Sequence, residues 1–286
     1  MSNSGYCLKT LKKYICEKEL KWAGCQIRHY DSIDSTNNEA KRLGRMGTPH
    51  GTLVIAEEQV AGKGRLGRNW DSPKGEAIYM TLLLRPEIHP ENASMLTLLA
   101  ALAVTDAINA VTGISVAIKW PNDIVIHGKK LCGILTEMSA DMNGIRYVVV
   151  GIGINCNMNS FPGVLEQTAT SLFLDTGVKQ SRERIVAEVL YAFEHYYEIF
   201  ISTEDLVNLK TTYERQLVNY NEKVRILSSG KEDGKSEYIG ISRGINEKGE
   251  LLVEDEAGYM HIVRTGEVSV RGIYGYTASV PVTERL

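Results

Sequence analysis

The sequence has no closely spaced cysteines or histidines. Its five cysteines are odd in number and widely separated, and no C-x-x-C pair occurs: Cys7, Cys16, Cys25, Cys132 and Cys156. This spacing argues against a disulfide framework and a zinc site, and it favours reduced thiols. The six histidines also stand singly along the chain. We therefore expect no metal-ligating cluster and a cytoplasmic location.

A strong net charge and a long apolar run are lacking too. The formal net charge is only −3 over 286 residues, so bulk electrostatics give no reason to expect nucleic acid or an anionic membrane as a partner. The N-terminal segment is polar and rich in lysine, unlike a signal peptide, and no run approaches membrane-spanning length. Residues 1–25 have room for one short helix, whereas a helix-turn-helix unit needs at least two. No DNA-binding module is expected.

The rest of the composition is ordinary for a globular chain, with 43% hydrophobic and 23% charged residues. Its length suits one large domain and one small domain. Apolar periodicity predicts helices within 1–24 and at 36–45, 90–111, 181–201 and 203–217. Strands are predicted at 27–33, 52–56, 77–84, 115–120, 124–126, 131–138 and 147–155. Five short β runs between 223 and 271 predict a small separate β-barrel, and 156–172 is predicted to be loop.

A polar cluster, Ser35-Thr36-Asn37, precedes the helix predicted at 36–45. Thr36 and Glu39 match the capping-box pattern, which explains one hydroxyl of the cluster. A group of polar side chains at a helix N-terminus equally suits a small polar ligand. Both interpretations stay open on the sequence alone.

A loop rich in glycine and positive charge follows the strand at 52–56. Three glycines and three cations alternate in Gly62-Lys63-Gly64-Arg65-Leu66-Gly67-Arg68, just before Trp70. Such a loop suits a phosphate, a carboxylate or both, because glycine lets backbone N–H groups approach a ligand and the cations add charge. The glycines spell G-x-G-x-x-G, but the flanking residues indicate more loop and no helix, which argues against dinucleotide binding. The alternative is a solvated basic turn.

Polar side chains also mark the ends of apolar strands between 115 and 155. They are Lys119, Asn122, Asp123, Lys130 and Asn155. A segment at 121–123 interrupts the strand at 115–120 before 124–126 resumes it, and Lys130 follows a tight turn. These residues could hold a polar ligand. Equally, Asn122 and Asp123 could only cap a turn, and Lys130 could be a solvated lysine of a hairpin. Gly151 and Gly153 indicate either a bulge or a place where a ligand approaches the backbone.

Six segments together form a recognisable signature. They are GKGRLGRNW at 62–70, KWPND at 119–123, KLCGIL at 130–135, GIGIN at 151–155, STN at 35–37 with Gln59, and GEVSVR at 266–271. These resemble motifs of the biotin protein ligases (biotin–[acetyl-CoA-carboxylase] ligases), in the same order, over residues 30 to 272. Lys63 stands where that family usually has arginine, so the charge is kept and the bidentate geometry is lost. Residues 1–25 are too short for the winged helix of bifunctional members, so the chain resembles the monofunctional class.

The resemblance implies an α+β fold. A class II aminoacyl-tRNA synthetase/biotin-ligase-like mixed sheet flanked by helices would be followed by a small C-terminal SH3-like β-barrel. The implied parts are a helical segment at 1–25, a catalytic biotin/ATP-binding domain at 26–219, an SH3-like domain at 220–275 and a tail at 276–286. The implied enzyme uses ATP and Mg²⁺ to form biotinyl-5′-AMP and transfers biotin to a lysine of a biotin carboxyl carrier domain. The resemblance also allows a homodimer that pairs through a sheet edge.

The resemblance assigns site residues as well. Biotin-binding residues would be Ser35, Thr36, Asn37, Gln59, Lys63, Gly64, Arg65, Lys130, Gly133 and Gly153. Nucleotide-binding residues would be Arg65, Arg68, Trp70, Lys119, Asn122 and Asn155, with Trp70 as an apolar wall. Arg65 would lie over the carboxylate and the α-phosphate, and Lys130 would meet the developing phosphate charge or the acyl oxygen. Asp123 would orient the incoming lysine or hold Lys130 or Arg65 in place, and Mg²⁺ would have few direct protein ligands.

Three other functions compete with this one. A lipoate ligase shares the architecture and the adenylate chemistry, although the glycine-rich loop and KWPND favour biotin. A non-catalytic, biotin-responsive regulator is disfavoured by the missing DNA-binding segment and the negative net charge. A nucleotide-binding oxidoreductase is disfavoured because no helix is predicted after the glycines.

Overall fold

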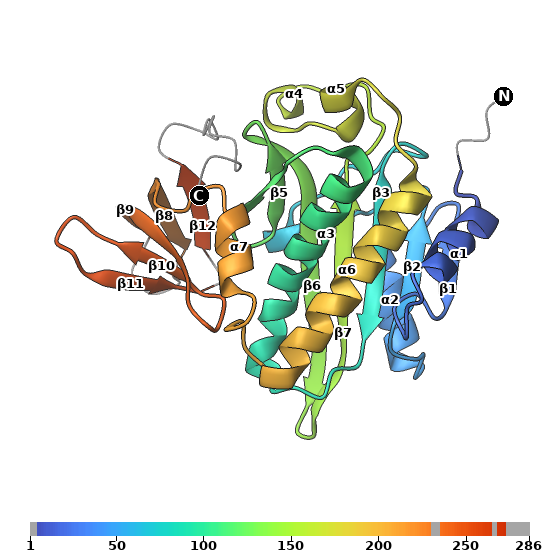
Figure 1. Ribbon diagram of the computed structural model, residues 1–286, viewed down its shortest axis with the longest axis horizontal. Helices are drawn as coiled ribbons and strands as arrows, with labels where there is room; N and C mark the ends of the chain where they lie inside the picture. Colours follow the sequence, from blue (N-terminus) through green and yellow to red (C-terminus); the bar gives the residue numbers. More distant parts are fainter. Residues whose placement is uncertain (1–4, 230–234, 265–267, 273–286) are drawn as a thin grey trace.

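Two β-sheets organise the chain, which the computed structural model describes at residues 5–229, 235–264 and 268–272 (Figure 1). The strands of the larger sheet are β1 (Ile27–Tyr30), β2 (Thr52–Ala56), β3 (Ile78–Leu84), β4 (Ala117–Lys119), β5 (Asp123–Ile126), β6 (Lys129–Asp141) and β7 (Gly144–Ile154). They lie in the order β1-β2-β3-β7-β6-β5-β4. β1 and β2 are parallel and the other neighbours are antiparallel, so the sheet is mixed as expected.

Helices cover both faces of this sheet. The helices of the described part of the chain are α1 (Leu8–Glu17), α2 (Thr36–Arg45), α3 (Leu96–Thr112), α4 (Leu165–Thr168), α5 (Leu172–Thr176), α6 (Arg182–Thr203) and α7 (Lys210–Gln216). α3 and α6 lie side by side on one face (Figure 1), and α2 packs on the other. Alternate side chains of β2 point to opposite faces of the sheet. Leu53 and Ile55 pack in the main core, whereas Val54 packs with Ala40 and Leu43 of α2. Sheet strands buried on both faces explain the continuous apolar runs in the sequence.

The α3 helix corrects the expectation that no run approaches membrane-spanning length. Together with the preceding 3₁₀ turn η2 (Pro90–Met95) it forms a 23-residue stretch, Pro90–Thr112, that is long and apolar enough to cross a membrane. In the structure, however, 67% of its most apolar window is buried inside the protein. A helix enclosed by a core is apolar nearly all round, which explains the composition. The helix ends at Gly113 as predicted, where φ is +72°.

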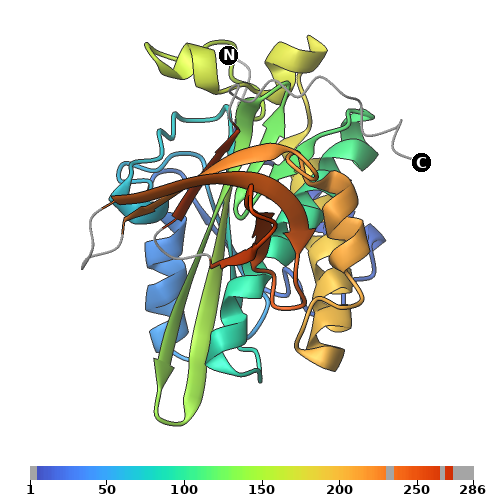
Figure 2. The same cartoon turned by 90° about the vertical axis from the view of Figure 1, so that its left-hand side faces the viewer.

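The smaller sheet contains the five strands expected near the C-terminus. They are β8 (Lys223–Ser229), β9 (Lys235–Ile245), β10 (Leu251–Glu254), β11 (Met260–Val263) and β12 (Val268–Gly272). These strands form one antiparallel sheet in the order β11-β10-β9-β8-β12, and Figure 2 shows it in front of the larger sheet. The buried Trp120 indole connects the two sheets by donating its N–H to the carbonyl of Gly249, at 2.9 Å. The start of the GEVSVR segment, residues 266–267, and the predicted tail at 276–286 lie outside the described residues.

The start of α2 differs from the predicted capping box. Ser35 is the N-cap residue, and its side chain makes no cap hydrogen bond. Thr36 is instead the first helical residue, and its N–H and Oγ1 donate to Oε1 of Gln59. Glu39 accepts from the hydroxyl of Tyr30 and does not reach back to the helix start. The capping-box prediction was wrong because a residue 23 positions away supplies the partner that the box would have supplied locally.

Two further segments also differ from expectation. Residues 124–126 do not resume the strand at 115–120, because β5 turns back and pairs antiparallel with β4. The reversal occurs at Trp120-Pro121, whose peptide bond is cis. The segment 156–172 is not all loop, since α4 lies within it and α5 begins at its end. Helices this short carry too little periodicity to be recognised in a sequence.

Candidate functional site

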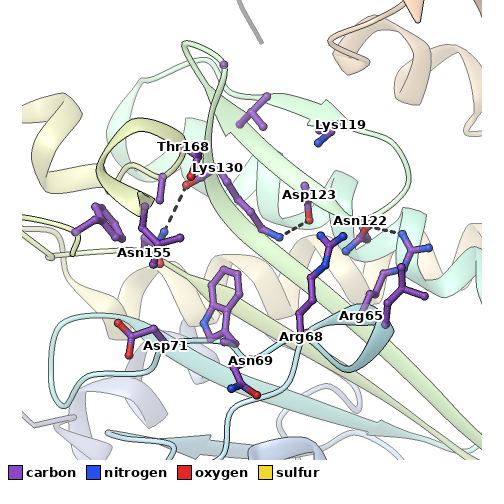
Figure 3. A pocket seen from close by; sticks show the side chains of 18 of the residues that line it. Arg65, Arg68, Asn69, Asp71, Lys119, Asn122, Asp123, Lys130, Asn155 and Thr168 are labelled. Atoms are coloured by element: carbon purple, nitrogen blue, oxygen red, sulfur yellow. Dashed lines mark hydrogen bonds and ion pairs between the residues drawn. The ribbon is translucent and has the colours of Figure 1, made fainter. Parts of the chain in front are cut away.

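Two adjoining cavities lie between the glycine-rich loop and the larger sheet. The larger has a volume of about 460 Å³ (Figure 3), and the smaller about 50 Å³. Residues that line both form their common wall: Gly64, Arg65, Trp70, Asn122 and Lys130. The loop and the strands β5 and β6 are distant in sequence, and the fold brings them together at this wall.

The glycine-rich loop is a hairpin in the structure. Two backbone hydrogen bonds close the hairpin. The N–H of Gly64 donates to the carbonyl of Arg68 at 2.7 Å, and the N–H of Trp70 donates to the carbonyl of Gly62 at 2.9 Å. Gly62 has no room for a side chain, because a Cβ there would lie 2.4 Å from the carbonyl oxygen of Trp70. Only Arg65–Gly67 forms a single 3₁₀ turn. A dinucleotide-binding fingerprint needs an α-helix directly after its glycines, and none follows here. The prediction that this loop does not bind a dinucleotide in that way is therefore confirmed.

Hydrogen bonds between side chains preorganise the polar end of the small cavity. Gln59 Oε1 accepts from the N–H of Thr36 at 2.9 Å and from its hydroxyl at 3.0 Å. Thr81 Oγ1 lies 2.8 Å from Thr36 Oγ1 and 2.7 Å from Asn37 Oδ1. Asn37 Nδ2 in turn donates to the carbonyl of Leu135 at 3.1 Å. All ten predicted biotin-binding residues line this cavity: Ser35, Thr36, Asn37, Gln59, Lys63, Gly64, Arg65, Lys130, Gly133 and Gly153.

Glycines on β6 and β7 form the floor of the site. Gly133 and Gly153 are paired across the two strands, and a Cβ on either would lie 2.8 Å from the ring of Trp70. The indole therefore rests directly on the floor, with its buried N–H lacking a partner among the described residues. A Cβ on Gly151 would lie only 2.1 Å from Asn37 Oδ1. The strand pairing is continuous at these glycines, so they mark close approaches of side chains and no bulge.

Lys130 and Asp123 form an ion pair at the common wall. Lys130 Nζ lies 2.7 Å from Asp123 Oδ1, and it also lies 5.1 Å from the ring centroid of Trp70. The Lys130 side chain is 35% exposed. The interpretation of Lys130 as a freely solvated hairpin residue is therefore wrong. Among the roles left open for Asp123, the structure favours holding Lys130.

Arg65 carries positive charge into the same wall. Its Nη1 donates to Asn122 Oδ1 at 2.7 Å (Figure 3). Asn122 Nδ2 in turn donates to the carbonyl of Ile134 at 3.1 Å. Burial lowers the pKa of the Arg65 guanidinium from its ordinary value, and the charge of Asp123 opposes that shift. Arginine still stays protonated near neutral pH. A partly desolvated cation of this kind binds an anion more strongly than a fully solvated one does.

The larger cavity suits a polyanion. All six predicted nucleotide-binding residues line it: Arg65, Arg68, Trp70, Lys119, Asn122 and Asn155. With Lys130, its cations outnumber its two carboxylates, Asp71 and Asp123. Asn155 is buried, and its Nδ2 donates to the carbonyl of Thr170 at 3.0 Å. That bond ties the segment after β7 to the cavity wall.

Sequence reasoning missed the apolar side of the larger cavity. The residues concerned are Met158, Phe161, Leu165, Ala169 and Val270. The first four lie in the segment predicted to be loop, where apolar residues at irregular spacing gave no periodic signal. Val270 comes from β12 of the smaller sheet, so only the tertiary structure places it here. Trp70 borders both cavities, although it was predicted to be a wall for the nucleotide alone.

Known proteins resemble this chain in both sequence and structure. Residues 30–155 match the model of the "Biotin/lipoate A/B protein ligase family". The chain is 38% identical over 268 residues to the bifunctional ligase/repressor BirA of Bacillus spizizenii, covering 90% of this chain and 80% of that one. It is 33% identical to the biotin–[acetyl-CoA-carboxylase] ligase of Paracoccus denitrificans, over 84% of this chain and 98% of that one. The structure of an Aquifex aeolicus biotin protein ligase with biotin and ATP superposes with a TM-score of 0.76 at 31% identity, over 87% and 99% of the two chains.

Proposed function

The chain belongs to the biotin protein ligase family, and from that premise we propose how its two cavities divide the reaction. It is an ATP-dependent enzyme that activates biotin as biotinyl-5′-AMP and passes biotin to a carboxyl carrier domain. Biotin would occupy the small cavity and the nucleotide the larger one. The observation that carries this assignment is the common wall, where Arg65 and Lys130 border both cavities.

The small cavity offers a matched set of groups for the ureido ring of biotin. Neutral donors and acceptors recognise an uncharged urea, and Ser35, Thr36 and Gln59 supply them beside the loop backbone at Lys63–Arg65. At about 50 Å³ the cavity is far below the roughly 300–1,000 Å³ of small-molecule sites. Biotin binding therefore requires a rearrangement, and the Trp70 indole on the glycine floor is the group that must move. This makes the loop a lid that opens for biotin and closes over it.

The first half-reaction would take place at the common wall. A carboxylate oxygen of biotin attacks the α-phosphorus of ATP, the new O–P bond forms, and the bond to the bridging oxygen breaks as pyrophosphate leaves. Two anions approach each other in this step, so fixed positive charge lowers its barrier. Arg65 would hold the carboxylate and the α-phosphate, and Lys130 would stabilise the developing phosphate charge. Asp123 holds Lys130 in position through the 2.7 Å ion pair.

The second half-reaction would use the mixed anhydride as an acyl donor. The neutral ε-amine of one carrier lysine attacks the acyl carbon, the amide C–N bond forms, and the C–O bond to AMP breaks. AMP leaves, and the nitrogen gives up its extra proton to solvent, which leaves the neutral amide. A closed loop would keep water from the anhydride until the amine arrives. The carrier domain as acceptor is supported by the activity for which the Paracoccus denitrificans relative is named, biotin–[acetyl-CoA-carboxylase] ligase.

Mg²⁺ would be bound mainly by the triphosphate. Among the residues that the structure describes, no group of three or more His, Cys, Asp or Glu side chains could hold a metal ion. Mg²⁺ characteristically uses one or two carboxylates together with substrate phosphates, and Asp71 and Asp123 line the larger cavity. The ion would neutralise charge on the triphosphate.

A cytoplasmic location and a homodimer are also proposed. All five cysteines are unpaired thiols in the structure, which suits a reducing compartment. The larger sheet ends in β1 and β4, and a sheet edge can pair with a second copy. Cell fractionation and sedimentation with and without biotin would test the two proposals.

Biotin-dependent pyrophosphate exchange tests the division of roles. The wild-type protein should exchange labelled pyrophosphate into ATP with biotin and not with lipoate, which separates it from a lipoate ligase. Lys130→Ala should lose about 100-fold or more of that rate, as when a group that stabilises transition-state charge is removed, while its melting temperature stays near wild type. A wild-type rate for Lys130→Ala would remove its assigned role. A gel shift with promoter DNA would reveal a regulator, and none is expected.

A further inference from the structure

A third cavity adjoins the two that the proposed function uses. Its volume is about 310 Å³. It is lined by the η2 turn and the start of α3, by the turn between β4 and β5, and by β6: Pro90, Glu91, Ala93, Ser94, Thr97, Pro121, Asn122, Ile134, Leu135, Thr136, Met138, together with Arg65 of the loop. Only Arg65 and Asn122 line all three cavities. The three cavities therefore meet at one hydrogen-bonded pair.

This arrangement matches a requirement of the second half-reaction. If biotin and the nucleotide fill the first two cavities, the acyl carbon between them lies at the common wall beside Arg65. A nucleophile must then reach that carbon by a route that neither substrate blocks. We propose that the third cavity is the groove that admits the acceptor lysine of the carrier domain. The proposal rests on the proposed function and names the surface at which its protein partner docks.

The lining suits a lysine side chain in particular. Pro90, Pro121 and Leu135 offer apolar surface to the methylene stem of a lysine. Glu91 is exposed at this groove, and its carboxylate lies 3.6 Å from the ring of His89, at a surface position where it attracts a cationic amine. Arg65 stands at the inner end, next to the other cavities. The stem, the ammonium group and the reacting end of a lysine each meet a complementary surface.

The order of charges along the groove also favours the reactive form of the amine. A lysine must lose a proton before it attacks, because only the neutral amine is a nucleophile. A nearby positive charge disfavours the protonated form of an amine. An ammonium group attracted by Glu91 would therefore approach Arg65 and give up its proton to solvent water in the groove, close to the acyl carbon. Glu91 would thus attract the carrier lysine to the groove, and Arg65 would favour the neutral form of its ε-amine.

Ser94→Trp and Glu91→Lys test the groove. Ser94 is exposed on the groove wall and lines neither of the other cavities, so an indole there narrows the groove alone. Ser115→Trp is the matched control, since Ser115 is exposed beyond the other end of α3, about 25 Å away at 1.5 Å per helical residue. Three rates should be measured for each variant: pyrophosphate exchange, capture of the adenylate by hydroxylamine, and transfer to the apo carrier domain.

The groove variants should lose only the reaction with the carrier. Ser94→Trp should lower kcat/KM for the carrier about tenfold or more, and Glu91→Lys should raise KM for the carrier several-fold. Exchange and hydroxylamine capture should stay within twofold of wild type, and Ser115→Trp should match wild type in all three. Unchanged carrier transfer in both groove variants, or an equal fall in all three rates, would overturn the proposal. Absence of exchange in the wild-type protein would instead overturn the proposed function.

Discussion

Two glycines on the same face of β7, Gly151 and Gly153, should respond to alanine in different ways. Neither has a positive φ, so the backbone accepts alanine at both positions. A Cβ on Gly151 would overlap Asn37 Oδ1 at 2.1 Å, whereas one on Gly153 would approach the Trp70 ring at 2.8 Å. Asn37 is buried in a hydrogen-bond network, but Trp70 belongs to the loop that we propose moves when biotin binds. Gly151→Ala should therefore lower the free energy of unfolding, and Gly153→Ala should weaken the binding of biotin.

The cost of Gly151→Ala can be worked from the bonds of Asn37. Its side chain bonds Thr81, the carbonyl of Leu135 and the carboxylate of Glu137, at 2.7, 3.1 and 2.9 Å. Losing two or three such bonds at about 1 kcal/mol each predicts a loss of about 2–3 kcal/mol in the free energy of unfolding.

For Gly153→Ala, the free energy of unfolding should change by less than about 1 kcal/mol, because only the half-buried indole of a loop residue, Trp70, is displaced. Its Kd for biotin should rise about tenfold or more, since the methyl group occupies the floor of the site. Urea unfolding and titration calorimetry measure the two quantities. Equal losses of stability in Gly151→Ala and Gly153→Ala would show that the two glycines do not differ in what they contact.

Three further variants probe single contacts. Gln59→Ala should raise the Kd for biotin about 10- to 100-fold by calorimetry, because it leaves the donors of Thr36 without their acceptor. Arg65→Ala should shorten the lifetime of bound biotinyl-5′-AMP about tenfold or more, measured by filter retention. Partial burial raises the pKa of Asp34, but hydrogen bonds from Arg42 and Asn38 outweigh it and lower that pKa to about 2. Asp34→Asn should therefore destabilise the protein above pH 4, with the difference from wild type vanishing as pH falls toward 2.

The sequence was most informative where chemistry and short motifs coincide. The glycine-rich loop, the polar residues Asn122 and Lys130, and the glycines at 151 and 153 were singled out from residue types alone, and the fold brings them to the two adjoining cavities. Their common feature is a polar or glycine residue at the end of an apolar strand, which is costly unless it serves a turn or a ligand. Gly133 was assigned through the family resemblance. The mixed sheet was implied by the family resemblance, whereas the continuous apolar strands by themselves indicate burial on both faces.

What could not be predicted depends on contacts between distant segments. Thr36 looked like a helix cap until Gln59 was placed beside it. Val270 reaches the larger cavity only because the smaller sheet packs against it, and the Trp120–Gly249 hydrogen bond joins positions 129 residues apart. On one side of the proposed groove, Glu91 and Ser94 belong to none of the motifs named from the sequence. Such features arise from tertiary packing, which periodicity and local propensity do not encode.

The central claim is that this chain biotinylates a carrier domain. The direct test is mass spectrometry of an apo biotin carboxyl carrier domain after incubation with the protein, ATP, Mg²⁺ and biotin. We expect a mass increase of one biotinyl group on one lysine, dependent on both ATP and biotin, and none when that lysine is replaced by arginine. An unchanged mass, or an increase that also occurs without ATP, would contradict it.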